Sequence, residues 1–213
     1  MENKIIITIA RGYGSGGKTI GKLLSEKLNM GYYNRDILQK AADDSGINEA
    51  LFAKADEKTN RGMLHRIFGR KPCANGEVIP PSSSNFVSEQ NLFNYQSKII
   101  KELAEKESCV IVGRCADYVL RDMPGVVRVY IYASPDSCVK KVMQTDGIDE
   151  TEAKRRIKSI DKQRSEYYSL YTGHDWQCAE NYDLCINTDN VSFEKATQLI
   201  CDYIKLRFDA DEK

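Results

Sequence analysis

The sequence lacks the features that mark secreted and membrane proteins. No stretch approaches the roughly 20 consecutive apolar residues of a membrane-spanning helix. The apolar run near the N-terminus, IIITIA, is also too short for the core of a secretory signal, and small polar residues follow it at once. We therefore expect a cytoplasmic protein that has no membrane partner.

The chain also lacks an excess of charge of either sign. Its 213 residues carry 31 Lys and Arg against 31 Asp and Glu, so the formal net charge is zero. A nucleic-acid-binding surface usually gives a protein a basic excess, so we expect no nucleic-acid partner. Any site that binds an anion must be local. The length fits one domain with one sizeable core.

Cysteine is present but lacks the spacing of a metal site. The seven cysteines are odd in number and scattered, and no Cys-x-x-Cys pair occurs. A zinc centre is therefore disfavoured. We expect free thiols, several of them buried as small apolar side chains.

Strands and helices are expected to alternate along the chain. Short, β-branched apolar runs predict strands buried in a parallel sheet at residues 4–10, 31–33, 108–114, 126–134 and 182–188. Apolar residues at helical spacing predict helices at 18–28, 35–42, 48–54, 90–106, 136–144, 149–173 and 192–208. This order predicts an α/β fold in which helices cover both faces of the sheet.

The stretch GYGSGGKT, residues 12–19, fits the pattern G-x-x-x-x-G-K-[ST] and stands between a predicted strand and a predicted helix. Backbone amides reach phosphate oxygens only where side chains are small, and the free amides of the next helix face the same anion. Lys18 would supply charge to the β- and γ-phosphates, and Thr19 a hydroxyl to Mg²⁺. The residues expected to hold ATP are Gly12, Tyr13, Gly14, Ser15, Gly16, Gly17, Lys18 and Thr19.

Two further candidate sites lie at, or just past, the carboxyl ends of predicted strands. Arg114 and Asp117 come after CVIVG, and Arg35 and Asp36 come after GYY and one asparagine. Side chains just past the carboxyl ends of parallel strands face the ligand crevice. Both pairs are thus candidates for contact with the group that receives the phosphate. The alternatives are a structural arginine at 114, a surface position for Arg35 and an N-capping role for Asp36.

The charged segment KRRIKSIDKQR, residues 154–164, has the composition of a lid. Phosphoryl transfer between small molecules needs cations at the moving group and a cover that excludes water. Asp161 and Arg164 share a helix face because they are three residues apart, whereas Arg156 lies off that face. A solvated, charged helix is the alternative.

Together these segments resemble the nucleoside monophosphate kinases and, among them, the cytidylate kinase-like family. The resemblance covers nearly the whole chain, in the order IARGYGSGGKTIGKLLSEKL, GYYNRDIL, CVIVGRCADYVL, VVRVYIYAS, RRIKSIDKQRSEYY and YDLCINT. It implies a three-layer α/β/α P-loop NTPase fold with a five-stranded parallel sheet, a helical acceptor-binding insert at about 35–95 and a lid at about 147–175. It also implies phosphoryl transfer from MgATP to a nucleoside monophosphate, typically CMP or dCMP.

The resemblance assigns roles by motif. The catalytic cations would be Lys18, Arg114, Arg155, Arg156 and Arg164, with Arg155 or Arg156 as the phosphate clamp. Asp117 would lie beside the monophosphate with Arg114, and Asp161 would meet the acceptor's sugar and phosphate with Arg164. The sequence departs from true cytidylate kinases on this acceptor side. YYNRDIL stands in place of an Asp-Thr/Ser-Gly turn, and GRCAD in place of Gly-Arg-Asp.

Other hypotheses stay open beside a nucleoside monophosphate kinase. One is a kinase of another small, hydroxylated metabolite, and another is a sensor that binds ATP without turnover. The guanine signature N-K-x-D is absent. The chain could be a monomer or a homodimer.

Several remaining side chains have two interpretations. Trp176 and the tyrosines at 167, 168 and 171 are expected to pack together, with stacking on a base as the alternative. His65 and His174 are expected in surface or loop positions. His65 belongs to a basic amphipathic stretch that could form a flap helix or a dimer contact, within the loop predicted at 58–90.

Overall fold

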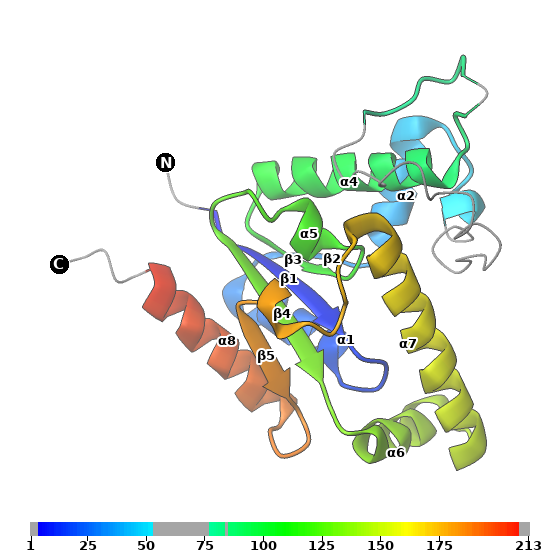
Figure 1. The fold of residues 1–213 in the computed structure, drawn as a ribbon. Coiled ribbons are helices and arrows are strands. Elements are labelled where there is room, and N and C mark those ends of the chain that lie inside the picture. The colour runs from blue at the N-terminus through cyan, green and yellow to red at the C-terminus, as the bar shows by residue number, and fades with distance from the viewer. Residues whose placement is uncertain (1–3, 53–76, 84, 209–213) are drawn as a thin grey trace.

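The computed structural model describes residues 4–52, 77–83 and 85–208. Within these residues, five parallel strands form one sheet in the order β2-β3-β1-β4-β5 (Figure 1). The strands are β1 (Ile6–Arg11), β2 (Gly31–Tyr33), β3 (Cys109–Val112), β4 (Val126–Tyr132) and β5 (Leu184–Asn187). The predicted five-stranded parallel sheet is confirmed.

β1 lies at the centre of the sheet because its side chains are apolar on both faces. It pairs with β3 on one side and β4 on the other, so that Thr8 stands opposite both Ile111 and Arg128. Ile6, Ile7 and Ile9 are almost completely buried. The central position brings the loop after β1 to the middle of the carboxyl edge.

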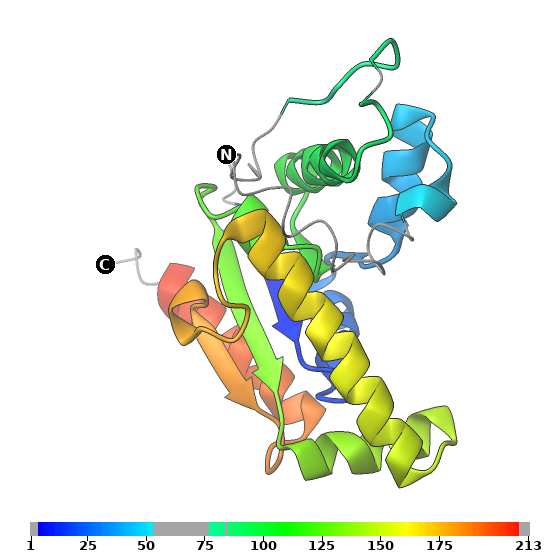
Figure 2. The same ribbon diagram turned by 45° about the vertical axis from the view of Figure 1, so that its right-hand side comes forward.

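Helices α1 (Gly17–Leu28) and α8 (Phe193–Phe208) cover one face of the sheet. Ile7 and Ile9 of β1 pack there with Ile20 of α1 and Ile200 of α8. Because side chains alternate along a strand, the next residues face the other side. Figure 2 shows α8 behind the sheet when the opposite helical layer is in front.

The other face is covered by α2 (Asp36–Ser45), α4 (Glu89–Lys106), α5 (Ala116–Val119) and α7 (Glu150–Thr172). Ile6 and Ala10 of β1 share one apolar cluster with Ile100 of α4 and Tyr167 of α7. In Figure 2, α7 crosses in front of the strands. The predicted three-layer α/β/α arrangement is therefore confirmed.

α6 (Pro135–Asp146) and α7 form a helical hairpin beyond β4 (Figure 1). Val139 and Val142 of α6 pack with Ala153 of α7, and the Tyr13 ring lies against this small cluster. Asp149 caps α7, since its side chain accepts a hydrogen bond from the Glu152 amide at 2.8 Å. The hairpin thus holds α7 beside the loop after β1.

The described elements differ from the predictions in a few places. The helix α5 and the short 3₁₀ turn Ala179–Asn181 were not expected. Of the helix predicted at 48–54, residues 49–52 are helical and the rest fall outside the described residues. His65 and most of the loop predicted at 58–90 also fall outside them.

Two sequence expectations can be checked on the described residues alone. The six cysteines among them are free, as predicted. None of the helices there is both long enough and apolar enough to span a bilayer.

Candidate active site

The carboxyl ends of β1, β2 and β3 meet at one edge of the sheet, beside α7. A cavity of about 950 Å³, the main cavity, opens there. It is lined by the loop after β1, by Asn34 and Arg35 after β2, by residues 113–115 and 117 after β3, and by the inward side of α7. Loops at this edge of a parallel sheet are the usual place for a ligand.

Hydrogen bonds from hydroxyl groups hold the loop after β1 against the ends of β4 and β5. The buried Ser15 hydroxyl donates to the backbone oxygens of Gly12 and Ile131, at 2.9 and 3.0 Å. Thr188 follows β5, and its hydroxyl donates to the backbone oxygen of Ser15 at 2.9 Å. Gly16 has a φ of 89°, which favours glycine, and α1 begins at the next residue. The loop therefore presents its amides and the helix N-terminus at one point.

Lys18 and Thr19 stand in the first turn of α1, and both are exposed. Lys18 lines the main cavity, but Thr19 is not among its lining residues. The predicted ATP-binding residues other than Ser15 and Thr19 all line this cavity. The structure thus brings most of the glycine-rich motif to one surface.

The tip of the loop is fastened to the helical hairpin through Tyr13. Its backbone amide donates to the Asp161 carboxylate at 2.8 Å, and its hydroxyl donates to Asp146 at 2.9 Å. Burial raises the pKa of Asp161, and the Arg164 charge opposes this. An anion bound by the loop would therefore lie near the Asp161 carboxylate, which already accepts a hydrogen bond from the Tyr13 amide of the loop.

Arg164 lines the main cavity from α7. Its guanidinium donates to the backbone oxygen of Arg11 at 3.0 Å and to Asp161 at 3.4 Å. The predicted shared face of Asp161 and Arg164 is the face that meets the loop after β1. The sequence spacing identified this face, although not its partner.

The chain makes an unusual turn after β3. Gly113, Arg114 and Cys115 have φ values of 81°, 63° and 53°, so three consecutive residues are left-handed. For residues other than glycine this conformation costs about 1–2 kcal/mol each. The turn places Arg114 in the lining of the main cavity. Strain of this kind clusters at functional sites.

Asp117 follows that turn in α5 and lies almost completely buried at the cavity wall. The Tyr168 hydroxyl of α7 donates to its carboxylate at 2.7 Å. Burial raises the pKa of Asp117, and it also raises the pKa of Tyr168. This pair joins the turn after β3 to α7.

Arg35 and Asp36 are separated by the start of α2. Arg35 is the residue before the helix and lines the main cavity, whereas Asp36 is the first helical residue, is exposed and does not line it. The alternative that Asp36 caps α2 is wrong, because Arg35 occupies the capping position. Only one of the two residues therefore reaches the site.

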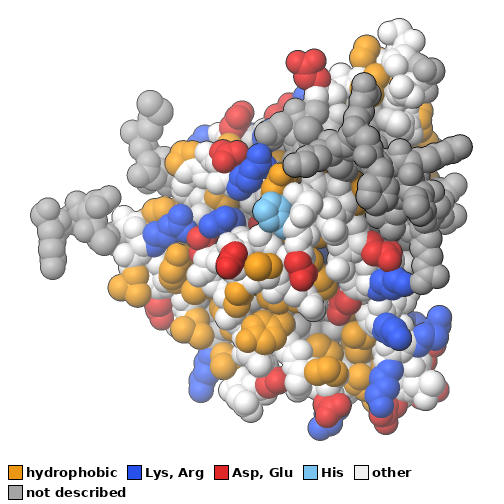
Figure 3. Space-filling view, in the orientation of Figure 1, with side chains coloured by type: hydrophobic (Ala, Val, Ile, Leu, Met, Phe, Trp, Pro, Cys, Tyr) orange, Lys and Arg blue, Asp and Glu red, His pale blue; other side chains and the backbone are white. Residues whose placement is uncertain are grey.

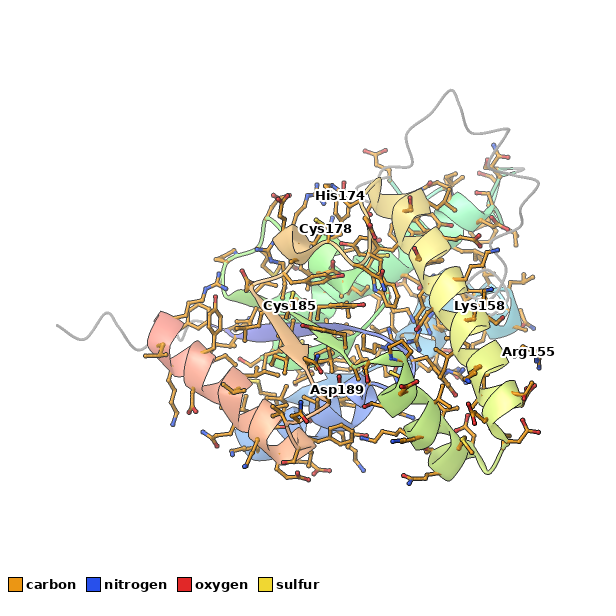
Figure 4. All side chains as sticks on the ribbon, turned by 60° about the horizontal axis from the view of Figure 1, so that its bottom comes forward. Arg155, Lys158, His174, Cys178, Cys185 and Asp189 are labelled. Carbon is orange, nitrogen blue, oxygen red and sulfur yellow. The ribbon has the colours of Figure 1, made fainter. Side chains whose placement is uncertain are left out.

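Neither candidate for the phosphate clamp lines the main cavity. The Arg155 side chain, 73% exposed, pairs with Glu152 at 2.7 Å and lies at the outer edge of α7 (Figure 4). Arg156 donates to Asp146 at 2.8 Å, so it buttresses the carboxylate that holds Tyr13. Figure 3 shows Lys and Arg side chains along this outer edge, over α7. Both arginines are paired with acidic side chains in this structure, and the clamp at Arg155 or Arg156 stays a prediction.

Sequence reasoning did not select several residues that line the main cavity. Arg11 immediately precedes the glycine-rich motif, and its place directly after a predicted strand could have identified it. Asn34, Asp146 and Gln163 carried no comparable signal. The aromatic group packs as predicted, since Trp176 and the tyrosines at 167, 168 and 171 belong to one buried cluster. Tyr167, Tyr168 and Trp176 also line the main cavity.

The main cavity concentrates positive charge in a protein whose net charge is zero. Among the described residues, its cationic lining residues are Arg11, Lys18, Arg35, Arg114 and Arg164, and its acidic ones are Asp117 and Asp146. Walls of low dielectric constant strengthen such a field. The cavity therefore offers charge for more phosphate than the loop alone would bind.

An anion-binding loop is shared by motors, GTPases and kinases. In this chain the cavity that contains the loop is also lined by cations that follow β2 and β3, so its positive charge is not confined to the loop. The chain is a P-loop kinase.

The family is defined by comparison with known proteins. The cytidylate kinase-like family matches residues 6–190, and the chain belongs to it. Over 200 residues it is 22% identical to cytidylate kinase of Sulfurisphaera tokodaii, covering 94% of this chain and 95% of that protein. Phosphoryl transfer from ATP is the activity of such a kinase.

Solved structures agree on the fold. An uncharacterized protein from Eubacterium ventriosum has a TM-score of 0.70 at 29% identity, over 95% of this chain and 99% of that one. Shikimate kinase from Bacteroides thetaiotaomicron has a TM-score of 0.52 at 14% identity, over 94% and 98%. The second likeness bears on the fold alone.

Proposed function

We propose that this kinase transfers the γ-phosphoryl group of ATP to a nucleoside monophosphate, with CMP or dCMP as the first acceptor to test. The products are ADP and a nucleoside diphosphate. The observation that carries the proposal is the row of cations opposite the loop. Arg35 and Arg114 follow two neighbouring strands and line the same cavity as the loop, so the charge there favours an anionic acceptor over a neutral one.

The pyrimidine preference is supported by the family and by the curated relative from Sulfurisphaera tokodaii, which is named a cytidylate kinase. The base preference is the finer part of the proposal, because the identity to that relative is 22%. The acceptor-binding region is proposed at about residues 35–95 and the lid at about 147–175. The proposal applies equally to a monomer and a homodimer.

The proposed reaction needs positioning and charge more than covalent chemistry. The amides of the loop and Lys18 bind the donor phosphates, while Arg35, Arg114 and Arg164 bind and orient the acceptor phosphate. The acceptor oxygen attacks the γ-phosphorus in line. That oxygen is largely ionised near neutral pH, since a phosphate monoester has a second pKa of about 6, so no general base is required.

Magnesium is the proposed metal. Among the described residues, no group of three or more His, Cys, Asp and Glu side chains is placed to hold a metal. Mg²⁺ keeps several waters and binds phosphate oxygens, so it needs few protein ligands. The exposed Thr19 hydroxyl beside Lys18 fits that requirement. When bound with ATP, Mg²⁺ supplies charge to the β- and γ-oxygens.

A coupled ADP-release assay tests the proposal. It uses MgATP with CMP, dCMP, UMP, AMP and GMP, and a control without acceptor. Lys18→Ala should lower kcat/KM by about 100-fold or more, because a cation at the transferred group is lost. The matched control is Lys22→Ala, one turn further along α1, where the side chain is 71% exposed and pairs with Glu26. It should stay within about twofold of the wild type.

The outcomes separate the candidate functions. Turnover with one pyrimidine monophosphate, lost in Lys18→Ala and kept in Lys22→Ala, supports the proposal and defines the acceptor. ATP binding without turnover on any acceptor would instead favour a nucleotide sensor or another acceptor. Normal turnover in Lys18→Ala would contradict the assigned donor site.

A further inference from the structure

One cation of the main cavity has no part in the proposed reaction so far. Arg11 is the last residue of β1 and directly precedes Gly12. Its side chain crosses two glycines. A β-carbon built at Gly17 would lie 2.5 Å from the Arg11 Cβ, and one built at Gly113 would lie 2.3 Å from its Nη1. The stem therefore lies against Gly17 and the guanidinium against Gly113.

This path gives the side chain a direction. Gly17 begins α1 at the loop that would hold the donor, and Gly113 follows β3. In the sheet, β3 lies between β1 and β2, so the guanidinium points toward the strands that carry Arg114 and Arg35. It thus stands between the donor loop and the acceptor cations.

α7 fixes Arg11 from the other side. The Arg164 Nη1 donates to the Arg11 backbone oxygen at 3.0 Å. This bond ties the end of β1 to α7. With its stem confined by Gly17 and its carbonyl bound, the Arg11 guanidinium loses little further freedom when it meets a ligand. A planar guanidinium held in this way matches two oxygens of one phosphate.

The two glycines differ in what the backbone demands of them. Gly113 has a left-handed φ of 81°, which by itself favours glycine. Gly17 has no such φ, and its closest neighbours are the Arg11 Cβ and Cγ, at 2.5 and 2.9 Å from a built β-carbon. Glycine at 17 is therefore explained by the room that Arg11 takes.

We infer that Arg11 is a further phosphate-binding residue of the acceptor subsite, and that Gly17 and Gly113 clear the path by which its guanidinium reaches that phosphate. The inference rests on the proposed function and adds to it a ligand for the acceptor's phosphate monoester. It also makes Gly113 a positioning residue that acts through Arg11.

Arg11→Gln tests the inference most directly. It should raise the acceptor KM by about 10- to 100-fold, because a charged hydrogen bond to phosphate is lost. The Kd for MgATP without acceptor should change by less than about threefold. That Kd can be read from the fluorescence of Trp176, the single tryptophan, which lines the main cavity. Equal losses for ATP and acceptor, or none for the acceptor, would overturn the inference.

Two further variants test whether the guanidinium shape of Arg11 matters and provide a matched control. Arg11→Lys keeps the charge but not the planar fork, so its acceptor KM should lie between wild type and Arg11→Gln. Arg121→Gln is the matched control, since the Arg121 guanidinium donates to the Tyr118 backbone oxygen and does not line the main cavity. It should leave both constants within about twofold.

A double-mutant cycle tests the role of Gly113. Gly113→Ala should raise the acceptor KM clearly more in the wild type than in Arg11→Gln, because the guanidinium that the added methyl would displace is absent from the second background. Similar losses in both backgrounds would assign the effect to backbone strain and overturn this part of the inference. Thermal melting checks that each variant is folded.

Inorganic phosphate separates this inference from the proposed function. Its Kd is measured by Trp176 fluorescence with the loop saturated by a non-hydrolysable ATP analogue. If no nucleoside monophosphate is phosphorylated but Arg11→Gln weakens phosphate binding about tenfold, the proposed acceptor fails and the Arg11 subsite stands. If phosphate binds equally well to wild type and Arg11→Gln, the inference fails whatever the acceptor.

Discussion

The two faces of α7 carry the same kinds of residue in different surroundings. On the outer face, Arg155 is 73% exposed and pairs with Glu152 on its own helix. On the inner face, Arg164 is 24% exposed and bonds to the backbone of Arg11 and to Asp161. Charge and helical position alone do not distinguish these two arginines. What distinguishes them is the loop after β1, which meets only the inner face.

This contrast teaches how to weigh a charged helix. An exposed ion pair within one helix contributes at most a few tenths of a kcal/mol, because water and salt screen it. A guanidinium that reaches across to another element is ordered by that element and can act on a ligand there. The variants below test whether the two faces differ in function as they do in structure.

The largest expected effect separates the two arginines directly. Arg164→Gln should lower kcat/KM by about 100-fold, because it removes a cation from the main cavity and a bond that orders β1. Arg155→Gln should stay within about twofold. Both are measured in the ADP-release assay at saturating MgATP with varied acceptor. Comparable losses in the two variants would favour a phosphate clamp at Arg155 and erase the contrast.

The next effect concerns stability. Tyr168→Phe removes the hydroxyl that donates to the buried Asp117 carboxylate at 2.7 Å, and should lower the free energy of unfolding by about 1–3 kcal/mol. The matched control is Tyr171→Phe, whose hydroxyl donates to the Glu89 backbone oxygen at 3.2 Å. That partner has no titratable charge. Urea unfolding at pH 5 and pH 8 measures both variants.

The pH dependence follows from the pKa of Asp117. Because burial raises this pKa, the folded protein holds the proton more tightly than the unfolded chain, and this group's contribution to stability falls as the pH rises between the two pKa values. Loss of the Tyr168 hydroxyl raises the pKa further. The cost of Tyr168→Phe should therefore be larger at pH 8 than at pH 5, whereas that of Tyr171→Phe should not change. The reverse order would contradict this assignment.

The smallest expected effect lies at Asp161, where an acidic side chain accepts from the amide of Tyr13. Asp161→Asn keeps an acceptor oxygen and removes the negative charge, so MgATP should bind about three- to fivefold more tightly at pH 8. Burial raises the pKa of Asp161, so wild-type affinity should improve as the pH falls and the carboxylate takes up a proton. Asp161→Asn should lack this trend.

Titration of Trp176 fluorescence with MgATP at pH 6 and pH 8 measures the change at Asp161. Asp202→Asn is the control, because Asp202 is exposed on α8 and accepts from Gln198 on the same helix. It should bind MgATP as the wild type does. Weaker binding by Asp161→Asn would show that the carboxylate supports the loop more than it repels the ligand.

Features with a local cause could be predicted from the sequence. The strand-loop-helix order around residues 12–19 follows from apolar runs and glycines, and Arg114 follows from its place after a buried strand. The spacing of Asp161 and Arg164 predicted their shared face. Each of these depends on a few neighbouring residues.

Features that depend on distant segments could not be predicted. Arg155 and Arg164 differ only in what α7 packs against. Asp36 turns away because α2 begins at that residue, and glycine at 17 serves Arg11 as well as the anion-binding loop. The left-handed turn at residues 113–115 has no signal beyond one glycine, because its other two residues rarely adopt that conformation.

In the left-handed turn at residues 113–115, the residue that favours stability at position 114 differs from the one that the proposed reaction needs. Arg114 has a φ of 63°, which costs an arginine about 1–2 kcal/mol and a glycine almost nothing. Laboratory evolution for heat resistance alone would favour glycine at position 114, and on the proposed role of Arg114 it would lose the kinase activity in the same step. Selection for turnover would restore the arginine. Position 114 therefore offers a one-residue measure of how much stability this protein exchanges for catalysis.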